Sequence, residues 1–158
     1  MSSLRQQDAE NERNLTVDFK QKHMDDAARH VAFLNDMSDS IHNIEVKERL
    51  RVLANRINDL KDMQVLFDSG ERELDQLYDR YLPYLQTIIL SYQKLEGSWN
   101  FEEIQRVRGM LMHSTEQLMD SILEIKRILP QDEMSMANAE KKAMEAKKQL
   151  EEKYGKTN

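Results

Sequence analysis

Between Ile104 and Leu129 apolar residues recur at steps of three and four positions, or at the sum of the two, and few folds accommodate this pattern. A helix turns once in about 3.6 residues, so this spacing gathers the apolar side chains on one face. Asn100 precedes the run as a capping residue, and Pro130 follows it. We therefore predict a helix that begins at about Asn100 and is closed by Pro130. Its stripe consists of Ile104, Val107, Leu111, Leu118, Ile122, Ile125 and Leu129.

The same spacing occurs in three earlier segments, residues 15–41, 46–67 and 71–96. Asp68-Ser69-Gly70 separates the second segment from the third, and Gly97 follows the third. Connections this short place consecutive helices side by side in opposite directions. The pattern therefore predicts four main helices.

The last part of the chain, residues 132–153, is rich in Ala, Glu and Lys, which favour a helix. Its apolar face is thin, so we expect a fifth helix that packs weakly. We predict an all-α fold, an elongated antiparallel helical bundle of four main helices with a weakly packed C-terminal fifth helix. It divides into a flexible arm (1–13), a helical bundle domain (14–130) and a C-terminal helix and tail (131–158). The thin face of the fifth helix consists of Met136, Ala139, Ala143 and Leu150.

Composition narrows the classes of protein to which the chain can belong. It has no cysteine, which excludes disulfides and thiolate chemistry and suits a reducing compartment, so we expect a cytoplasmic protein. No run approaches the roughly 20 apolar residues that a membrane span needs, and we expect none. The formal net charge of -6 disfavours nucleic acid, because neutralising phosphates needs a basic surface.

Histidines are the main candidates for metal or acid–base chemistry. His23 and His30 lie seven residues apart on one predicted face, with Asp26 one turn from His30, a spacing that permits a metal ion. A solvated helix face explains the same pattern, and we favour it because no further inward ligand completes the set. His113 and Glu116 are also adjacent on a helix. The sequence contains no Gly-rich phosphate loop and no nucleophile elbow, and we predict no catalytic, metal-binding or cofactor-binding residue.

Pro83 lies inside the predicted helix 71–96, and a proline there predicts a kink or a new helix start. Four tyrosines lie near it in the sequence. Tyr81 and Tyr92 fall on the predicted buried stripe, whereas Tyr84 points away from it and Tyr78 flanks it. Exposed tyrosines beside a bend are typical of a docking surface. The alternative is that all four tyrosines line a second helix contact. The candidate interaction surface is therefore Tyr78, Pro83 and Tyr84.

The stretch from Tyr78 to Pro83, Tyr-Asp-Arg-Tyr-Leu-Pro, followed by Leu85, Ile89 and Tyr92-Gln-Lys-Leu95, resembles a bacterial family described as 5-bromo-4-chloroindolyl phosphate hydrolysis proteins. The resemblance extends loosely from about Val31 to Leu129. It implies a helical bacterial protein that is associated with proteins of toxic-anion (tellurite) resistance. It implies no known active site.

These features together favour binding over catalysis. We expect a non-enzymatic helical protein-interaction module of the bacterial cytoplasm, an accessory factor in tellurite resistance or envelope stress. Its partner is a protein or a second copy of the chain, and a homodimer is the simplest case. The alternative, suggested by the family description, is a phosphomonoester hydrolase with a metal held by His23, Asp26 and His30 or by His113 and Glu116. Binding to an anionic membrane surface, a third possibility, conflicts with the acidic balance.

Overall fold

The computed structural model describes the backbone of residues 2–154 and the side chains of residues 19–131 and 140–153. Within this part of the chain every regular element is helical, which confirms the all-α prediction. The elements follow in the order α1 (Ser2–Ser40), α2 (Ile44–Leu66), α3 (Glu71–Gln76), the π-helical turn η1 (Leu77–Tyr81), α4 (Leu82–Glu96) and α5 (Phe101–Tyr154).

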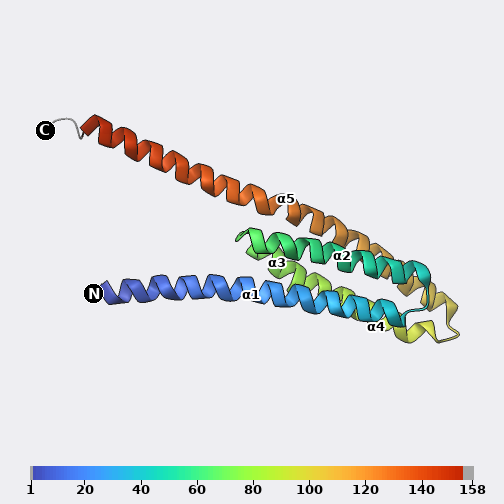
Figure 1. Ribbon diagram of the computed structural model, residues 1–158. Helices are drawn as coiled ribbons and strands as arrows, with labels where there is room; N and C mark the ends of the chain where they lie inside the picture. Colours follow the sequence, from blue (N-terminus) through green and yellow to red (C-terminus); the bar gives the residue numbers. More distant parts are fainter. Residues whose placement is uncertain (1, 155–158) are drawn as a thin grey trace.

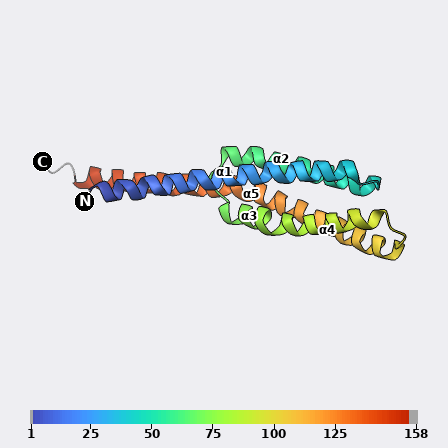
Figure 2. The same cartoon turned by 90° about the horizontal axis from the view of Figure 1, so that it is seen from below.

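The helices pack as two pairs that are joined along α2 and α5 (Figure 1). α2 returns beside α1, and α5 returns beside the continuous α3–η1–α4 segment. The connections at residues 41–43 and 97–100 lie at one end of the molecule (Figure 2), and both chain ends lie at the other. At that second end α1 and α5 extend past α2 and α3 and diverge (Figure 1). The paired region, from residue 19 to Pro130, is called the body below.

The body has one continuous apolar core. α2 contributes a run of fully buried side chains that includes Leu50, Leu53 and Ile57, and α5 contributes Leu111 and Ile122. These residues come from the stripes that the three- and four-residue spacing predicts. Burying such a side chain stabilises the fold by about 1.5–3 kcal/mol, so the stripes account for the pairing of the helices.

Polar side chains cap the helices at the closed end. Asn43 Oδ1 accepts the backbone N–H of Val46 at the start of α2. Asn100 Oδ1 does the same for Glu103 at the start of α5, which confirms the predicted start of that helix. Glu96, the last residue of α4, accepts the backbone N–H groups of His42 and Asn43. This carboxylate therefore joins the two connections.

α5 continues through Pro130, so the predicted end of the helix at that residue, and a separate fifth helix after it, are wrong. Proline removes one helical hydrogen bond and crowds the preceding turn. Two contacts support the helix at this point. Leu129 is fully buried against Gly70, and its carbonyl accepts a hydrogen bond from Ser69 Oγ at 2.9 Å. Strong helix formers after Pro130, among them Ala143, extend the helix to Tyr154.

At the other end, α1 begins at Ser2 instead of near residue 15. Residues 2–13, which were predicted to be a flexible arm, are thus helical in their backbone. Their mobility in solution stays a prediction. The tail at 155–158 lies outside the described residues.

The predicted segment 71–96 has the expected bounds but contains a π-helical turn. In η1 the backbone N–H of Leu82 donates to the carbonyl of Leu77, five residues earlier. The wider turn shifts the helix phase by one residue. Leu82 therefore enters the core in place of Tyr81, and Tyr78 turns inward. Pro83 is the second residue of α4, directly after the π-helical turn. The helix continues into α4 without a side-chain cap, so the new start with Asp79 as its cap is not formed.

Candidate interaction surfaces

The tyrosines around Pro83 divide into buried and exposed residues. Tyr78 is 0% exposed, so its predicted place on an exposed surface is wrong. Its hydroxyl donates to Oε1 of Gln64, a buried residue of α2. Tyr81, expected in the core, is 46% exposed, and Tyr84 is 61% exposed as predicted. Pro83 is half-buried beside them.

The two exposed tyrosines line a groove of about 430 Å³ between α4 and α5. Leu85 and Leu118 supply apolar walls, and Ser114 and Ser121 are small enough to leave the groove open. Tyrosine rings beside serine hydroxyls can pack on an apolar side chain and hydrogen-bond its backbone. The groove is therefore suited to contact with a peptide or a helix, although no feature of it selects one occupant.

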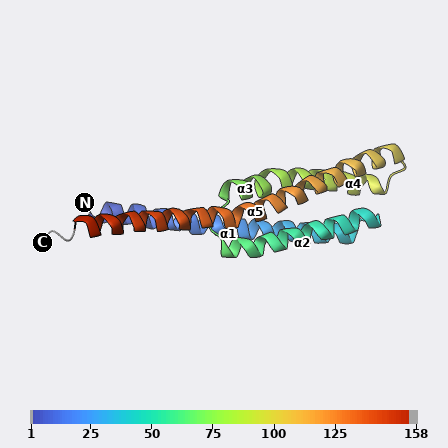
Figure 3. The ribbon, with the colours of Figure 1, turned by 90° about the horizontal axis from the view of Figure 1, so that it is seen from above.

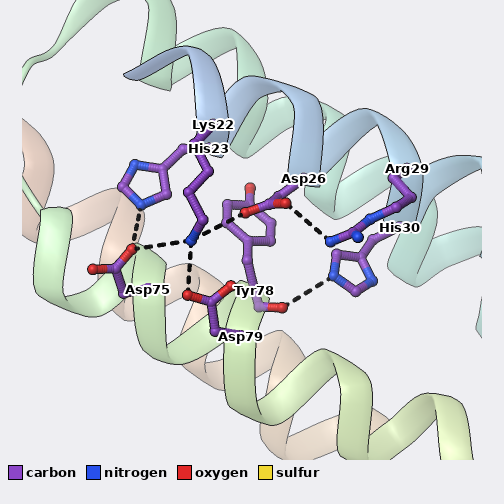
Figure 4. A network of polar contacts seen from close by, with 8 residues as sticks. All are labelled: Lys22, His23, Asp26, Arg29, His30, Asp75, Tyr78 and Asp79. Carbon is purple, nitrogen blue, oxygen red and sulfur yellow. Dashed lines mark hydrogen bonds and ion pairs between the residues drawn. The ribbon is translucent and has the colours of Figure 1, made fainter. Parts of the chain in front are cut away.

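A cluster of polar side chains lies where α1 packs against α3 and η1, around the candidate residues His23 and His30 (Figure 4). His23 Nε2 lies 2.7 Å from Asp75 Oδ1. His30 Nε2 donates to the backbone carbonyl of Tyr78 at 3.1 Å. Both histidines are buried. Each histidine ring thus contacts a different partner on the α3–η1 segment, and the two rings do not point at a common site.

Lys22 occupies the centre of this cluster. Its Nζ lies 2.8 Å from Asp79 Oδ2, 3.7 Å from Asp26 Oδ2 and 3.9 Å from Asp75 Oδ1. The hydrogen bond to Asp79, with the charges of the other carboxylates, raises the pKa of Lys22 and keeps its ammonium charged. An ammonium at this position supplies the positive charge that the three carboxylates require.

Asp26, the third residue of the candidate metal set, is 8% exposed. Its Oδ1 accepts from Arg29 at 2.9 Å, whereas its buried Oδ2 accepts no hydrogen bond from the described side chains and forms only an ion pair with Lys22 at 3.7 Å. Among the side chains that the structure describes, no group of three or more His, Asp or Glu could hold a metal ion. The candidate set of His23, Asp26 and His30, which we disfavoured from the sequence, is thus not assembled as a metal site.

Burial lowers the pKa of His30. The hydrogen bond to the Tyr78 carbonyl raises this pKa, but by less. The neutral imidazole is the form that suits this environment. His113, on the other hand, is exposed, and its neighbour Glu116 accepts from Arg49 at 3.3 Å. The second predicted pair therefore faces solvent on the surface of the body.

The third surface is the part of α5 that extends beyond the body, residues 140–153, called the α5 extension (Figure 3). Ile122, Leu129, Ala143 and Leu150 share one seven-residue register. Ile122 and Leu129 are fully buried on the body, whereas every side chain of the extension is exposed. The stripe that closes the core thus continues onto a segment of α5 whose described side chains, 140–153, are all exposed.

Sequence reasoning identified most of this stripe but missed its continuity. It placed a helix boundary at Pro130 and omitted Ala146, which completes the spacing from Ala143 to Leu150. The seven-residue repeat that continues across Pro130 was the signal that could have shown this continuity. It also missed Lys22, because nothing in the local sequence shows that Asp75 and Asp79 face it.

No family profile, no curated protein and no solved structure matches the chain. Among the described residues, no helix is long and apolar enough to cross a membrane.

Proposed function

We propose that this chain is a non-enzymatic helical protein-interaction module of the bacterial cytoplasm that forms a homodimer through the α5 extension. The observation that carries the proposal is the continuation of the buried α5 stripe from Leu129 onto the exposed side chains of Ala143, Ala146 and Leu150. We further propose that each body is an elongated antiparallel bundle of its helices.

The α5 extension continues a helix that the body already nucleates, so its own cost is that of keeping exposed turns ordered. Most helical stability in proteins comes from packing of an apolar face, and propensity alone leaves such turns marginal. The stripe residues Ala143, Ala146 and Leu150 of the α5 extension are exposed, and Leu150 is 58% exposed. A partner that covers the stripe removes this apolar area from water and stabilises the helix, as in coiled coils.

Light scattering coupled to size-exclusion chromatography tests the proposal on the full chain. We expect a dimer that becomes a monomer in the double variant Ala143→Asp, Leu150→Asp, because a buried carboxylate at the seam is strongly unfavourable. Met144→Asp is the matched control, since Met144 is 72% exposed but lies off the stripe. A full-length monomer at high concentration, or equal loss in the control, would refute the proposal.

The physiological setting is proposed from the resemblance around Tyr78 to Leu95, which implies an association with toxic-anion resistance. We propose that the module is an accessory factor in tellurite resistance or envelope stress. Deletion of the gene in its host should then increase sensitivity to tellurite, and the wild-type chain, but not the Ala143→Asp, Leu150→Asp variant, should restore growth. Unchanged growth of the deletion strain on tellurite and under envelope stress would contradict this part.

A further inference from the structure

We propose that the second copy pairs antiparallel to the first, with the two-fold axis between Ala143 and Ala146. This inference rests on the homodimer proposed above and specifies its geometry. The register of the stripe, the charges that flank it and the position of the body each favour this geometry.

The register sets which residues meet. Ala143 and Leu150 occupy one apolar position of the seven-residue repeat, called position a, and Ala146 occupies the other, position d. In an antiparallel pair each a residue faces a d residue of the partner. Ala143 then faces the partner's Ala146, and Ala146 faces the partner's Ala143. Two alanines in each central layer allow the helices to approach closely, and the same surface serves both copies, as two-fold symmetry requires.

The flanking charges distinguish the two possible orientations. Glu140 and Lys147 stand at position e, and Lys142 stands at position g. A parallel pair places Lys142 opposite the partner's Lys147, which brings like charges together twice. An antiparallel pair places Glu140 opposite the partner's Lys147, which brings opposite charges together twice. Charges at these positions set the orientation of coiled coils, and here they favour the antiparallel one.

The position of the body favours the same orientation. On the body the α5 stripe faces α2 and α4. The helix phase drifts by about 20° per seven residues, hence by about 40° from Leu129 to Ala143, which is less than a quarter turn. The stripe of the extension therefore faces the side on which the body lies. A parallel partner, continued toward its own N-terminus, would run into α2 and α4. An antiparallel partner keeps its body at the far end of the paired segment.

The length of the extension is consistent with this arrangement. With the axis between Ala143 and Ala146, the partner's Tyr154 lies opposite residue 135. The loop at 67–70 contacts α5 at Leu129, through Ser69 and Gly70. Residue 135 and Leu129 are six residues apart, which is about 9 Å of helix at 1.5 Å per residue. The partner helix thus ends before it reaches the loop.

Distance measurement between spin labels tests the orientation directly, because the chain has no native cysteine. A single Gln131→Cys substitution places one label on each copy at an exposed position. The antiparallel dimer separates the two labels by 27 residues of helix, about 40 Å. A parallel dimer holds them at about the spacing of two packed helices, 8–10 Å between axes, plus the length of the label arms.

A charge substitution gives an independent result. Lys147→Glu should weaken the antiparallel dimer about tenfold, because both ion pairs become repulsive, whereas it would tighten a parallel one. Adding Glu140→Lys should restore the affinity. Lys148→Glu, on the outer face, is the matched control and should leave the dimer unchanged. Dissociation constants come from light scattering over a dilution series.

The outcomes separate the two proposals. A dimer with a long label distance that Lys147→Glu weakens supports the antiparallel geometry. A dimer with a short label distance that Lys147→Glu tightens overturns the geometry and leaves the proposed homodimer standing. A full-length monomer overturns both.

Discussion

The hydrogen bond between Tyr78 and Gln64 should be among the largest single polar contributions to the stability of the body. Both side chains are buried, at 0% and 2% exposure, and the Tyr78 hydroxyl donates to Gln64 Oε1. Burial raises the pKa of Tyr78, so the hydroxyl keeps its proton at neutral pH and remains a donor. Tyr78→Phe leaves the Gln64 oxygen buried without this donor.

The expected loss is about 1–3 kcal/mol in the free energy of unfolding, the cost of an unsatisfied buried polar group. For a chain of this length that corresponds to a melting temperature lower by roughly 2–12 °C. Gln64→Leu should cost a similar amount, because it leaves the Tyr78 hydroxyl unpaired. The double variant should cost clearly less than the sum, since both polar partners are then apolar.

Urea denaturation followed by far-ultraviolet circular dichroism measures all three variants. A coupling energy of about 1–3 kcal/mol between the two substitutions is the expected result. Leu85→Ala serves as the control, because it creates a cavity in the same region and removes no polar partner. Its effect on the free energy of unfolding should add to that of Gln64→Leu without coupling. If the effects of Tyr78→Phe and Gln64→Leu are additive within about 0.3–0.5 kcal/mol, the reasoning about this bond is refuted.

Four further measurements test other parts of the structure. Gly70→Ala should destabilise the fold by about 1–2 kcal/mol or more in thermal unfolding, because Gly70 has a φ of 77° and a Cβ there would collide with Leu129; an unchanged melting temperature would contradict this. Glu96→Gln should cost about 1 kcal/mol in urea, since it weakens two hydrogen bonds to backbone N–H groups, and Glu102→Gln is the control. The lowered pKa of His30 means that the unfolded chain binds the extra proton first, so stability should fall as pH drops below about 6.5, and less so in His30→Gln; equal pH profiles would contradict it. Purified chain should not hydrolyse 5-bromo-4-chloroindolyl phosphate with or without added divalent metal, and steady turnover would favour the phosphomonoester hydrolase instead.

The candidate sites were predictable only in part. The spacing of histidines on α1 correctly placed His23 and His30 on one face, because that relation depends on helix periodicity alone. The solvated helix face that we favoured for them is wrong, since both side chains are buried against the α3–η1 segment. Their partners, Asp75 and the Tyr78 carbonyl, belong to a segment about 50 residues away, and no local pattern indicates them. The place of Lys22 among three carboxylates likewise results from the crossing of α1 and η1.

Helix formation and the identity of the core faces were determined by the sequence itself. The three- and four-residue spacing in α2 and in the first half of α5 selects residues such as Leu53 and Ile122, because a helix of fixed periodicity turns spacing into direction. Tertiary structure decided what happens where local rules compete. The π turn before Pro83 placed Leu82 in the core instead of Tyr81 and turned Tyr78 inward, since the packing of the buried segment outweighs the cost of one wider turn. Packing of Leu129 likewise supports α5 at Pro130, where local preference alone predicts an end.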